Sequence, residues 1–194
     1  HWRVEIKVAP DRANFITNTT WYNPMPSTQA YYNWMTAAAF AKDDLEMVFP
    51  GDRYLKHNGE VLPWPIDEKG RNLTYYDNNR FEGHKSYHVV GAWKNFFGGY
   101  YHQDQYGFGH WAPQDEMPGQ KLWLWALSDE GGIWEDHLTD TDGQYIEFQA
   151  GRQLVQYSPG DHENPIRKAS FDPYGIDQWT EAWFPIGPLG GMVE

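Results

Sequence analysis

Residues 96–151 hold most of the side chains of this chain that could do chemistry together. The segment mixes histidines and carboxylates with tryptophans and tyrosines, in stretches that alternate like β-strands. A pyranose has apolar C–H faces that stack on flat indole rings, and a rim of hydroxyls that needs hydrogen-bond donors and acceptors. This combination therefore indicates a sugar site. The alternative is a β-protein with a tryptophan-rich core.

Strand alternation separates the side chains of the segment 145–150 into two faces. Tyr145, Glu147 and Gln149 share one face, and Ile146 and Phe148 share the other with Ala150. The apolar set predicts the core side of the strand, so Glu147 is expected on a polar face beside a tyrosine and a glutamine. The plainer interpretation is that Glu147 only accepts a hydrogen bond from a neighbouring loop.

A second carboxylate stands between aromatic rings near the end of the chain. Glu181 shares a strand face with Trp179 and Trp183, and Trp123 shares a face with Trp125. These four tryptophans are candidate stacking platforms for a sugar. If these strand faces lie side by side, they predict a groove that is lined by aromatic rings and has carboxylates and imidazoles at its base.

The hairpin expected over residues 96–112 carries the candidate histidines. Tyr100, His102 and Asp104 share a face of its first arm, and His110 lies on the second arm. Tyr100 and Asp104 are candidate sugar contacts, and His102 or His110 is a candidate proton partner. A structural role for at least one histidine remains the alternative.

These residue types fit two kinds of sugar chemistry. Glu147 and Glu181 could flank a glycosidic bond, one protonating the leaving oxygen and the other acting as nucleophile or base. An acid among tryptophans would have a raised pKa, which suits a proton donor. A His–Glu pair could instead open and close a pyranose ring through the anomeric hydroxyl and the ring oxygen.

Metal and cofactor motifs do not account for these residues. His102 and His110 lie eight positions apart with no HExxH motif, which gives little support for zinc. The run from Asp140 to Gly143 lacks the rest of a calcium loop and is typical of a turn. No Walker A, GxGxxG or GxSxG motif is present. We therefore expect neither a metal nor a cofactor.

The composition favours an uncharged partner. The chain has 194 residues, of which 18% are aromatic, and a formal net charge of −12. Such a surface repels phosphate backbones, so nucleic-acid binding is not expected, and a neutral oligosaccharide or polysaccharide fits better. The aromatic side chains are too numerous for all of them to be buried, which favours an aromatic-lined groove.

The sequence also bounds the setting of the protein. Cysteine is absent, which excludes disulfides and thiolate catalysis, and no apolar run approaches the length that crosses a bilayer. The chain opens directly on a strand-like segment without an initiator methionine. We therefore expect a single domain over residues 1–194 that is a piece of a longer or processed protein, and sequence alone does not give its oligomeric state.

Short alternating runs joined by Gly, Pro and Asn turns predict an all-β fold, most simply a sandwich of antiparallel strands. Residues 2–8 predict a half-buried strand, Asn58-Gly59 a hairpin turn, and residues 132–138 one short helical turn. The other expected strands cover residues 14–22, 45–49, 87–93, 96–102, 108–112, 121–127, 145–154 and 179–185, with residues 31–40 ambiguous.

Several segments resemble one family of uncharacterised domains, the DUF5107 family. They are Phe96–His102, Gly109–Ala112, Pro118–Trp125, Leu138–Gly151 and Trp183–Ile186. The resemblance covers most of residues 30–190. It implies a galactose-mutarotase-like β-supersandwich, here without its N-terminal strands, and a periplasmic or secreted bacterial protein concerned with glycans. In mutarotase-like enzymes a His and a Glu of the concave sheet face do the chemistry, which implies His102 or His110 with Glu147.

The leading hypothesis is a carbohydrate-active domain that binds a sugar on an aromatic-lined sheet face, as a glycoside hydrolase-like enzyme with paired carboxylates. The alternatives are an aldose mutarotase or epimerase, a non-catalytic glycan-binding module, and a purely structural sandwich.

Overall fold

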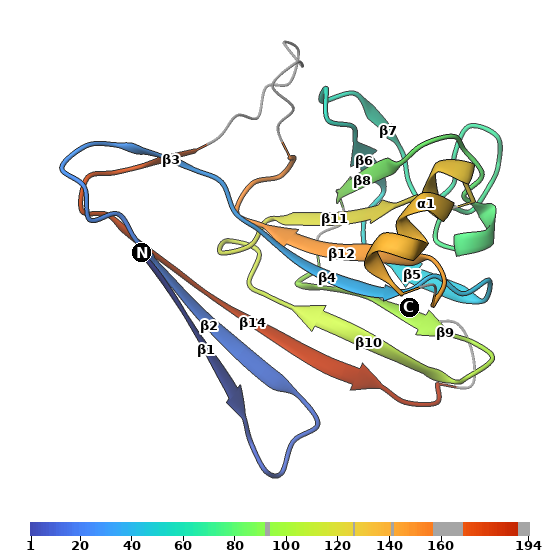
Figure 1. The fold of residues 1–194 in the computed structure, drawn as a ribbon, viewed down its shortest axis with the longest axis horizontal. Helices are drawn as coiled ribbons and strands as arrows, with labels where there is room; N and C mark the ends of the chain where they lie inside the picture. Colours follow the sequence, from blue (N-terminus) through green and yellow to red (C-terminus); the bar gives the residue numbers. More distant parts are fainter. Residues whose placement is uncertain (92–93, 126, 141, 157–168, 190–194) are drawn as a thin grey trace.

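The computed structural model describes residues 1–91, 94–125, 127–140, 142–156 and 169–189. Nearly half of them lie in antiparallel strands, which form two six-stranded sheets and a small two-stranded one (Figure 1). The expected all-β sandwich of antiparallel strands is therefore confirmed.

The first sheet has the strand order β1-β2-β14-β10-β9-β5. Its strands are β1 (Trp2–Val8), β2 (Phe15–Tyr22), β14 (Ile176–Ile186), β10 (Tyr106–Trp111), β9 (Phe96–Tyr101) and β5 (Leu45–Val48). The predicted hairpin is formed by β9 and β10, in which Gly98 pairs with Gly109.

The second sheet has the order β4-β12-β11-β8-β6-β7. Its strands are β4 (Trp34–Phe40), β12 (Tyr145–Gly151), β11 (Gly119–Leu124), β8 (Lys85–Val90), β6 (Arg53–Leu55) and β7 (Val61–Pro63). The remaining elements are β3 (Gln29–Tyr31), β13 (Ala169–Phe171), the short 3₁₀ helix η1 (Tyr76–Asn78) and the helix α1 (Asp129–Leu138).

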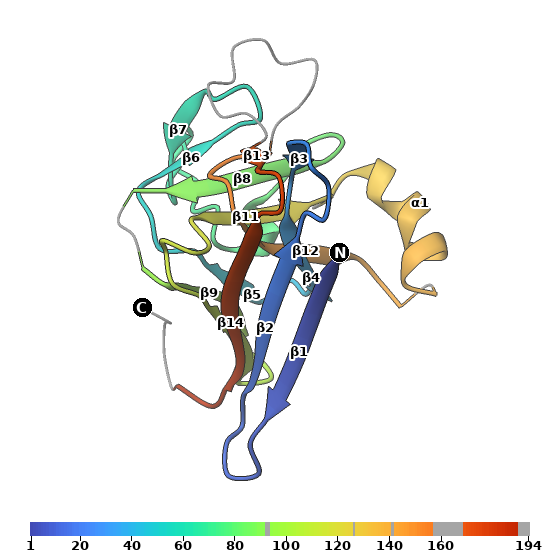
Figure 2. The ribbon, with the colours of Figure 1, turned by 90° about the vertical axis from the view of Figure 1, so that its left-hand side faces the viewer.

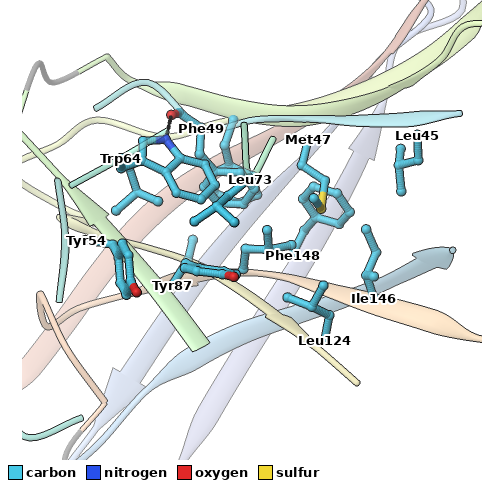
Figure 3. Packing of buried hydrophobic residues seen from close by; sticks show 14 of the residues in the cluster. Leu45, Met47, Phe49, Tyr54, Trp64, Leu73, Tyr87, Leu124, Ile146 and Phe148 are labelled. Atoms are coloured by element: carbon cyan, nitrogen blue, oxygen red, sulfur yellow. Dashed lines mark hydrogen bonds between the residues drawn. The ribbon is translucent and has the colours of Figure 1, made fainter. Parts of the chain in front are cut away.

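Aromatic and aliphatic side chains of both sheets pack between them. Figure 3 shows Phe49, which follows β5, beside Phe148 of β12, with ring centroids 5.6 Å apart. Ile146 and Phe148 are fully buried, which confirms the predicted core side of this strand. Trp64 closes one end of the core and donates its indole N–H to the Phe49 carbonyl at 3.0 Å.

The first strand, β1, differs from the half-buried pattern that the sequence predicts for residues 2–8. Trp2, Ile6 and Val8 lie on one face of β1 but are 73%, 68% and 72% exposed. The β1–β2 hairpin projects beyond the second sheet (Figures 1 and 2), so no strand of that sheet covers its apolar face.

Two local predictions are refined by the structure. The expected short helical turn is the ten-residue helix α1, which begins after Ser128. The hairpin at Asn58-Gly59 is formed by β6 and β7, and Gly59 adopts a φ of 81°. A positive φ at this turn suits glycine because glycine lacks a Cβ.

Candidate functional site

The candidate site lies on the face of the second sheet that points away from the first sheet, which we call the outer face. Because Ile146 and Phe148 of β12 fill the core, alternation turns Tyr145, Glu147 and Gln149 outward. The polar face that the sequence predicts for this strand is therefore formed.

The strand register brings charged and aromatic side chains of neighbouring strands beside Glu147. On β11, Trp123 lies opposite Glu147 and Lys121 lies opposite Gln149. On the other side of β11, Lys121 lies opposite His88 of β8. Directly opposed residues lie about 5 Å apart, so these side chains form one row across the sheet, in which Lys121, Gln149 and His88 are buried and Glu147 and Trp123 are partly exposed.

Glu147 is partly buried and held by a neighbouring amide. Gln149 donates its Nε2–H to Glu147 Oε2 at 2.6 Å. Burial raises the pKa of the Glu147 carboxyl, although the Gln149 hydrogen bond and the Lys121 charge oppose that rise. A carboxyl with a raised pKa exchanges protons more readily near neutral pH, which is a property of general acids and bases.

Lys121 is buried on the same face. Its ammonium donates to Gln149 Oε1 at 3.3 Å and to the side-chain oxygen of Gln156, and it lies 5.9 Å from the Trp34 ring centroid. Burial lowers the pKa of Lys121 to about 8, while the charge of Glu147 opposes the shift. Gln149 therefore bridges the Lys121 ammonium and the Glu147 carboxylate.

His88 is held neutral between two backbone groups. Its Nδ1 lies 2.9 Å from the Leu55 carbonyl, and the backbone N–H of Gln156 donates to its Nε2 at 3.1 Å. Burial lowers the pKa of His88 to about 3. Since both ring nitrogens are engaged, His88 supports the floor of the outer face and does not offer a free proton donor.

Aromatic rings extend the outer face toward one end of β11. The Trp123 ring lies 6.0 Å from Tyr145 and 5.2 Å from Trp125, measured between centroids. The exposed imidazole of His84 lies 5.7 Å from Trp123 at an interplanar angle of 32°. Two of the predicted stacking residues, Trp123 and Trp125, are thus brought together beside Glu147.

The residues that the sequence analysis missed here are Lys121, His88 and His84. Lys121 and His88 alternate with core residues of their own strands, Leu122 and Tyr87, so strand alternation was the signal that could have found them. His84 precedes its strand, and no local pattern marks it.

The other predicted pair, His110 and Glu181, lies on the face of the first sheet that is turned toward the interior of the protein. His110 Nε2 lies 2.8 Å from Glu181 Oε2, and Trp179 donates its indole N–H to Glu181 Oε1 at 2.8 Å. His110 and Glu181 are 1% and 2% exposed, and Trp183 packs on His110 with centroids 4.9 Å apart.

The single groove expected from the strand faces is therefore not formed. β14 belongs to the first sheet, and its Trp179–Trp183 face turns toward the interior, whereas Glu147 faces outward on the second sheet. Glu147 and Glu181 do not face each other, because the second sheet's own core layer lies between them. The catalytic roles assigned to both residues remain predictions.

A cavity of about 350 Å³ opens beside Glu181, under the uncovered β1–β2 hairpin. Its walls include Trp21, Thr19 and Trp179. Both oxygens of Glu181 are already hydrogen-bonded, one to His110 and one to Trp179, so the cavity does not border a carboxylate without partners.

The remaining predicted residues form a third group at the turn of the β9–β10 hairpin. His102 Nε2 lies 2.7 Å from the buried Glu46 carboxylate, and the Tyr100 ring lies 5.1 Å from the His102 ring. Asp104 forms an exposed ion pair with Lys42 at 2.5 Å. This group lies apart from Glu147 as well.

The described ranges contain no group of three or more His, Asp or Glu side chains arranged to hold a metal ion. Within the same ranges, no helix is long and apolar enough to cross a membrane.

Comparison with known proteins gives a family match over nearly the whole chain. The family described as a domain of unknown function (DUF5107) matches residues 1–186.

Solved structures of similar fold come from several bacteria. A TPR-domain containing protein from Parabacteroides distasonis is 19% identical, with a TM-score of 0.76, over 100% of this chain and 31% of that one. A candidate aldose 1-epimerase from Klebsiella pneumoniae is 10% identical, with a TM-score of 0.65, over 97% of this chain and 47% of that one. A galactose mutarotase related enzyme from Lactobacillus acidophilus is 11% identical, with a TM-score of 0.59, over 100% and 63%.

This chain thus spans less than two thirds of each of these three proteins, and the identities establish similarity of fold alone. The fold is galactose-mutarotase-like, and the chain belongs to the DUF5107 family.

Proposed function

We propose that the outer face of the second sheet binds a neutral sugar or oligosaccharide and exchanges protons at its anomeric centre, as an aldose mutarotase or epimerase does. The observation that carries the proposal is Glu147. It is a partly buried carboxyl of raised pKa, linked through Gln149 to Lys121 and set opposite Trp123.

The strand spacing gives the ligand a place between two titratable groups. Trp123 of β11 has Glu147 on one neighbouring strand, and His84 lies just before the other neighbouring strand, β8. Two strand spacings amount to about 10 Å. A pyranose stacked on Trp123 would then have a carboxylate on one side and an imidazole on the other.

Ring opening needs one proton removed from the anomeric hydroxyl and one delivered to the ring oxygen. In our proposal Glu147 takes the first proton and His84 delivers the second, and ring closure reverses both transfers. The Lys121 ammonium favours the carboxylate form of Glu147, which suits a base.

The fold similarity to proteins that carry the names aldose 1-epimerase and galactose mutarotase supports this reaction over hydrolysis. Hydrolysis by paired carboxylates needs two carboxyl groups within about 5–10 Å on either side of one bond. Glu181, the predicted second carboxylate, is buried with His110 in the interior.

The second candidate is a non-catalytic glycan-binding module. The cluster of Trp123, Trp125 and Tyr145 favours it, because stacking platforms alone suffice for binding.

The test measures anomer interconversion by NMR on a panel of neutral aldoses, and also binding and product release on neutral oligosaccharides. The proteins are wild type, Glu147→Gln, His84→Gln and the control Glu68→Gln, which alters an exposed glutamate elsewhere. Faster interconversion by wild type and the control, lost in the first two variants with binding retained, is the expected result. Binding without turnover in all four proteins would favour the binding module, and glycoside release would favour hydrolysis.

A further inference from the structure

Helix α1 is fixed at the end of β11, close to the proposed sugar site. Ser128 donates its hydroxyl to the carbonyl of Gly83 at 2.8 Å and lies as near to that of Trp125, and the Gly83 N–H donates to Glu130 at 3.1 Å. The helix also approaches closely, since a Cβ built on Gly131 would lie 2.8 Å from the Trp125 Cβ. The position of α1 relative to Trp125 is therefore set by several contacts.

This helix adds one more ring to the aromatic series of the outer face. Trp134 stacks on Trp125 with centroids 6.0 Å apart and an interplanar angle of 17°, and Trp125 in turn contacts Trp123. Trp134 is nevertheless 40% exposed, and Ile133 and Leu138 of the same helix are 63% and 59% exposed. A helix that turns its large apolar side chains outward beside a polar site is unusual for a surface with no partner.

Charge restricts what can lie on these rings. No lysine or arginine occurs between Lys121 and Arg152, whereas α1 alone carries Asp129, Glu130, Glu135 and Asp136. The carboxylates of α1 therefore disfavour phosphate groups, uronic acids and anionic lipid headgroups at Trp125 and Trp134. Uncharged hydroxyl-rich rings meet no such penalty and can stack on indole faces.

We propose that Trp125 and Trp134 form a second sugar subsite, so that the ligand is a neutral oligosaccharide of at least two residues rather than a monosaccharide. One sugar unit lies on Trp123 beside Glu147, and the next units follow the rings toward α1. This inference rests on the proposed function, because the first subsite is the one that contains Glu147.

The test is the dependence of affinity on ligand length, measured by calorimetry with neutral gluco-, manno- and galacto-oligosaccharides from one to four units. Wild type is expected to bind the tetrasaccharide of its preferred series at least about tenfold more tightly than the monosaccharide. Trp134→Ala should lose most of this gain and leave monosaccharide binding unchanged, while Trp134→Phe should retain most of it.

Trp111→Ala is the matched control, since Trp111 is also 40% exposed but lies on β10 of the first sheet. It should leave both affinities unchanged. Two results would overturn the second subsite and leave the proposed function intact. One is monosaccharide binding with no increase in affinity for longer ligands, and the other is an increase in affinity that persists in Trp134→Ala. Failure of every sugar to bind wild type would overturn both.

Discussion

Two glutamates of this protein have similar sequence surroundings and opposite structural positions. Glu147 and Glu181 each lie on a β-strand among aromatic residues. Each also has a polar partner, which is Gln149 on the same strand for Glu147 and His110 on the neighbouring strand for Glu181. Glu147 remains partly exposed and is held by the amide of Gln149. Glu181 is enclosed and has both oxygens occupied, by His110 and Trp179.

The difference shows that the hydrogen-bonding demand of the interior occupies both oxygens of Glu181, whereas Glu147 stays partly exposed. A buried carboxylate needs hydrogen-bond partners for both oxygens. Glu181 has them, so a ligand could bind its oxygens only by displacing His110 or Trp179. Glu147 keeps contact with solvent, so a ligand can reach it. We therefore propose that the outer face is the reactive region and that the His110–Glu181 pair is structural.

The largest expected effect is on stability, in the interior. Glu181→Ala should lower the free energy of unfolding by about 3–5 kcal/mol, because it leaves the His110 and Trp179 N–H groups buried without a partner. Urea unfolding at pH 7 measures this. A loss below about 1 kcal/mol would remove the structural interpretation of the pair.

The second effect is on activity, at the outer face. Glu147→Gln should reduce anomer interconversion by about 100-fold or more, the usual contribution of a general base. Its free energy of unfolding should change by less than about 1 kcal/mol, since the amide keeps the shape of the side chain. If instead the variant unfolds as readily as Glu181→Ala, the contrast between the two glutamates fails.

The third effect concerns Lys121 and pH. Burial lowers the pKa of Lys121 to about 8 from its ordinary value of 10.5, so between these pH values the unfolded chain binds more protons at this site than the folded chain. Stability from this group therefore rises as pH increases from about 8 to 10.5. The difference in unfolding free energy between wild type and Lys121→Met should shift in favour of wild type between pH 7.5 and pH 10.

The same variant sharpens the link to Glu147. Removal of the Lys121 charge should raise the pKa of the Glu147 carboxyl further, which carboxyl-selective NMR titration would show. An unchanged Glu147 pKa would mean that the Lys121 charge does not act on the Glu147 carboxyl.

The smallest effect is expected at the hairpin turn. Asp104→Asn removes an exposed ion pair with Lys42, and such pairs contribute little to stability. Neither the melting temperature nor sugar binding should change measurably. Weakened binding in this variant would support the predicted role of Asp104 as a ligand contact and place the sugar nearer the β9–β10 turn.

Strand alternation was enough to predict most of the fold. The pattern in residues 145–150 assigned Ile146 and Phe148 to the core and Glu147 to the polar face, and all three positions are as expected. The pairing of β9 with β10 likewise followed from local turn residues. Period-two patterns are local, so a single sequence reports them directly.

The sequence could not show which sheet each strand joins. The alternation of Trp179, Glu181 and Trp183 was read correctly as one face, but nothing local says that this face is the interior of the first sheet. For the same reason β1 was expected to be half-buried, although no strand in the described ranges covers Trp2 or Ile6. Strand neighbours depend on long-range pairing, which alternation does not encode.

The most direct test of the central claim follows the indole N–H signals of the tryptophans by NMR while a neutral oligosaccharide is added. We predict that the signals of Trp123 and Trp125 on the outer face of the second sheet shift with sugar concentration, while those of Trp179 and Trp183 on β14 of the first sheet stay in place. Shifts confined to Trp179 and Trp183 would contradict this prediction and move the sugar to the cavity beside Glu181.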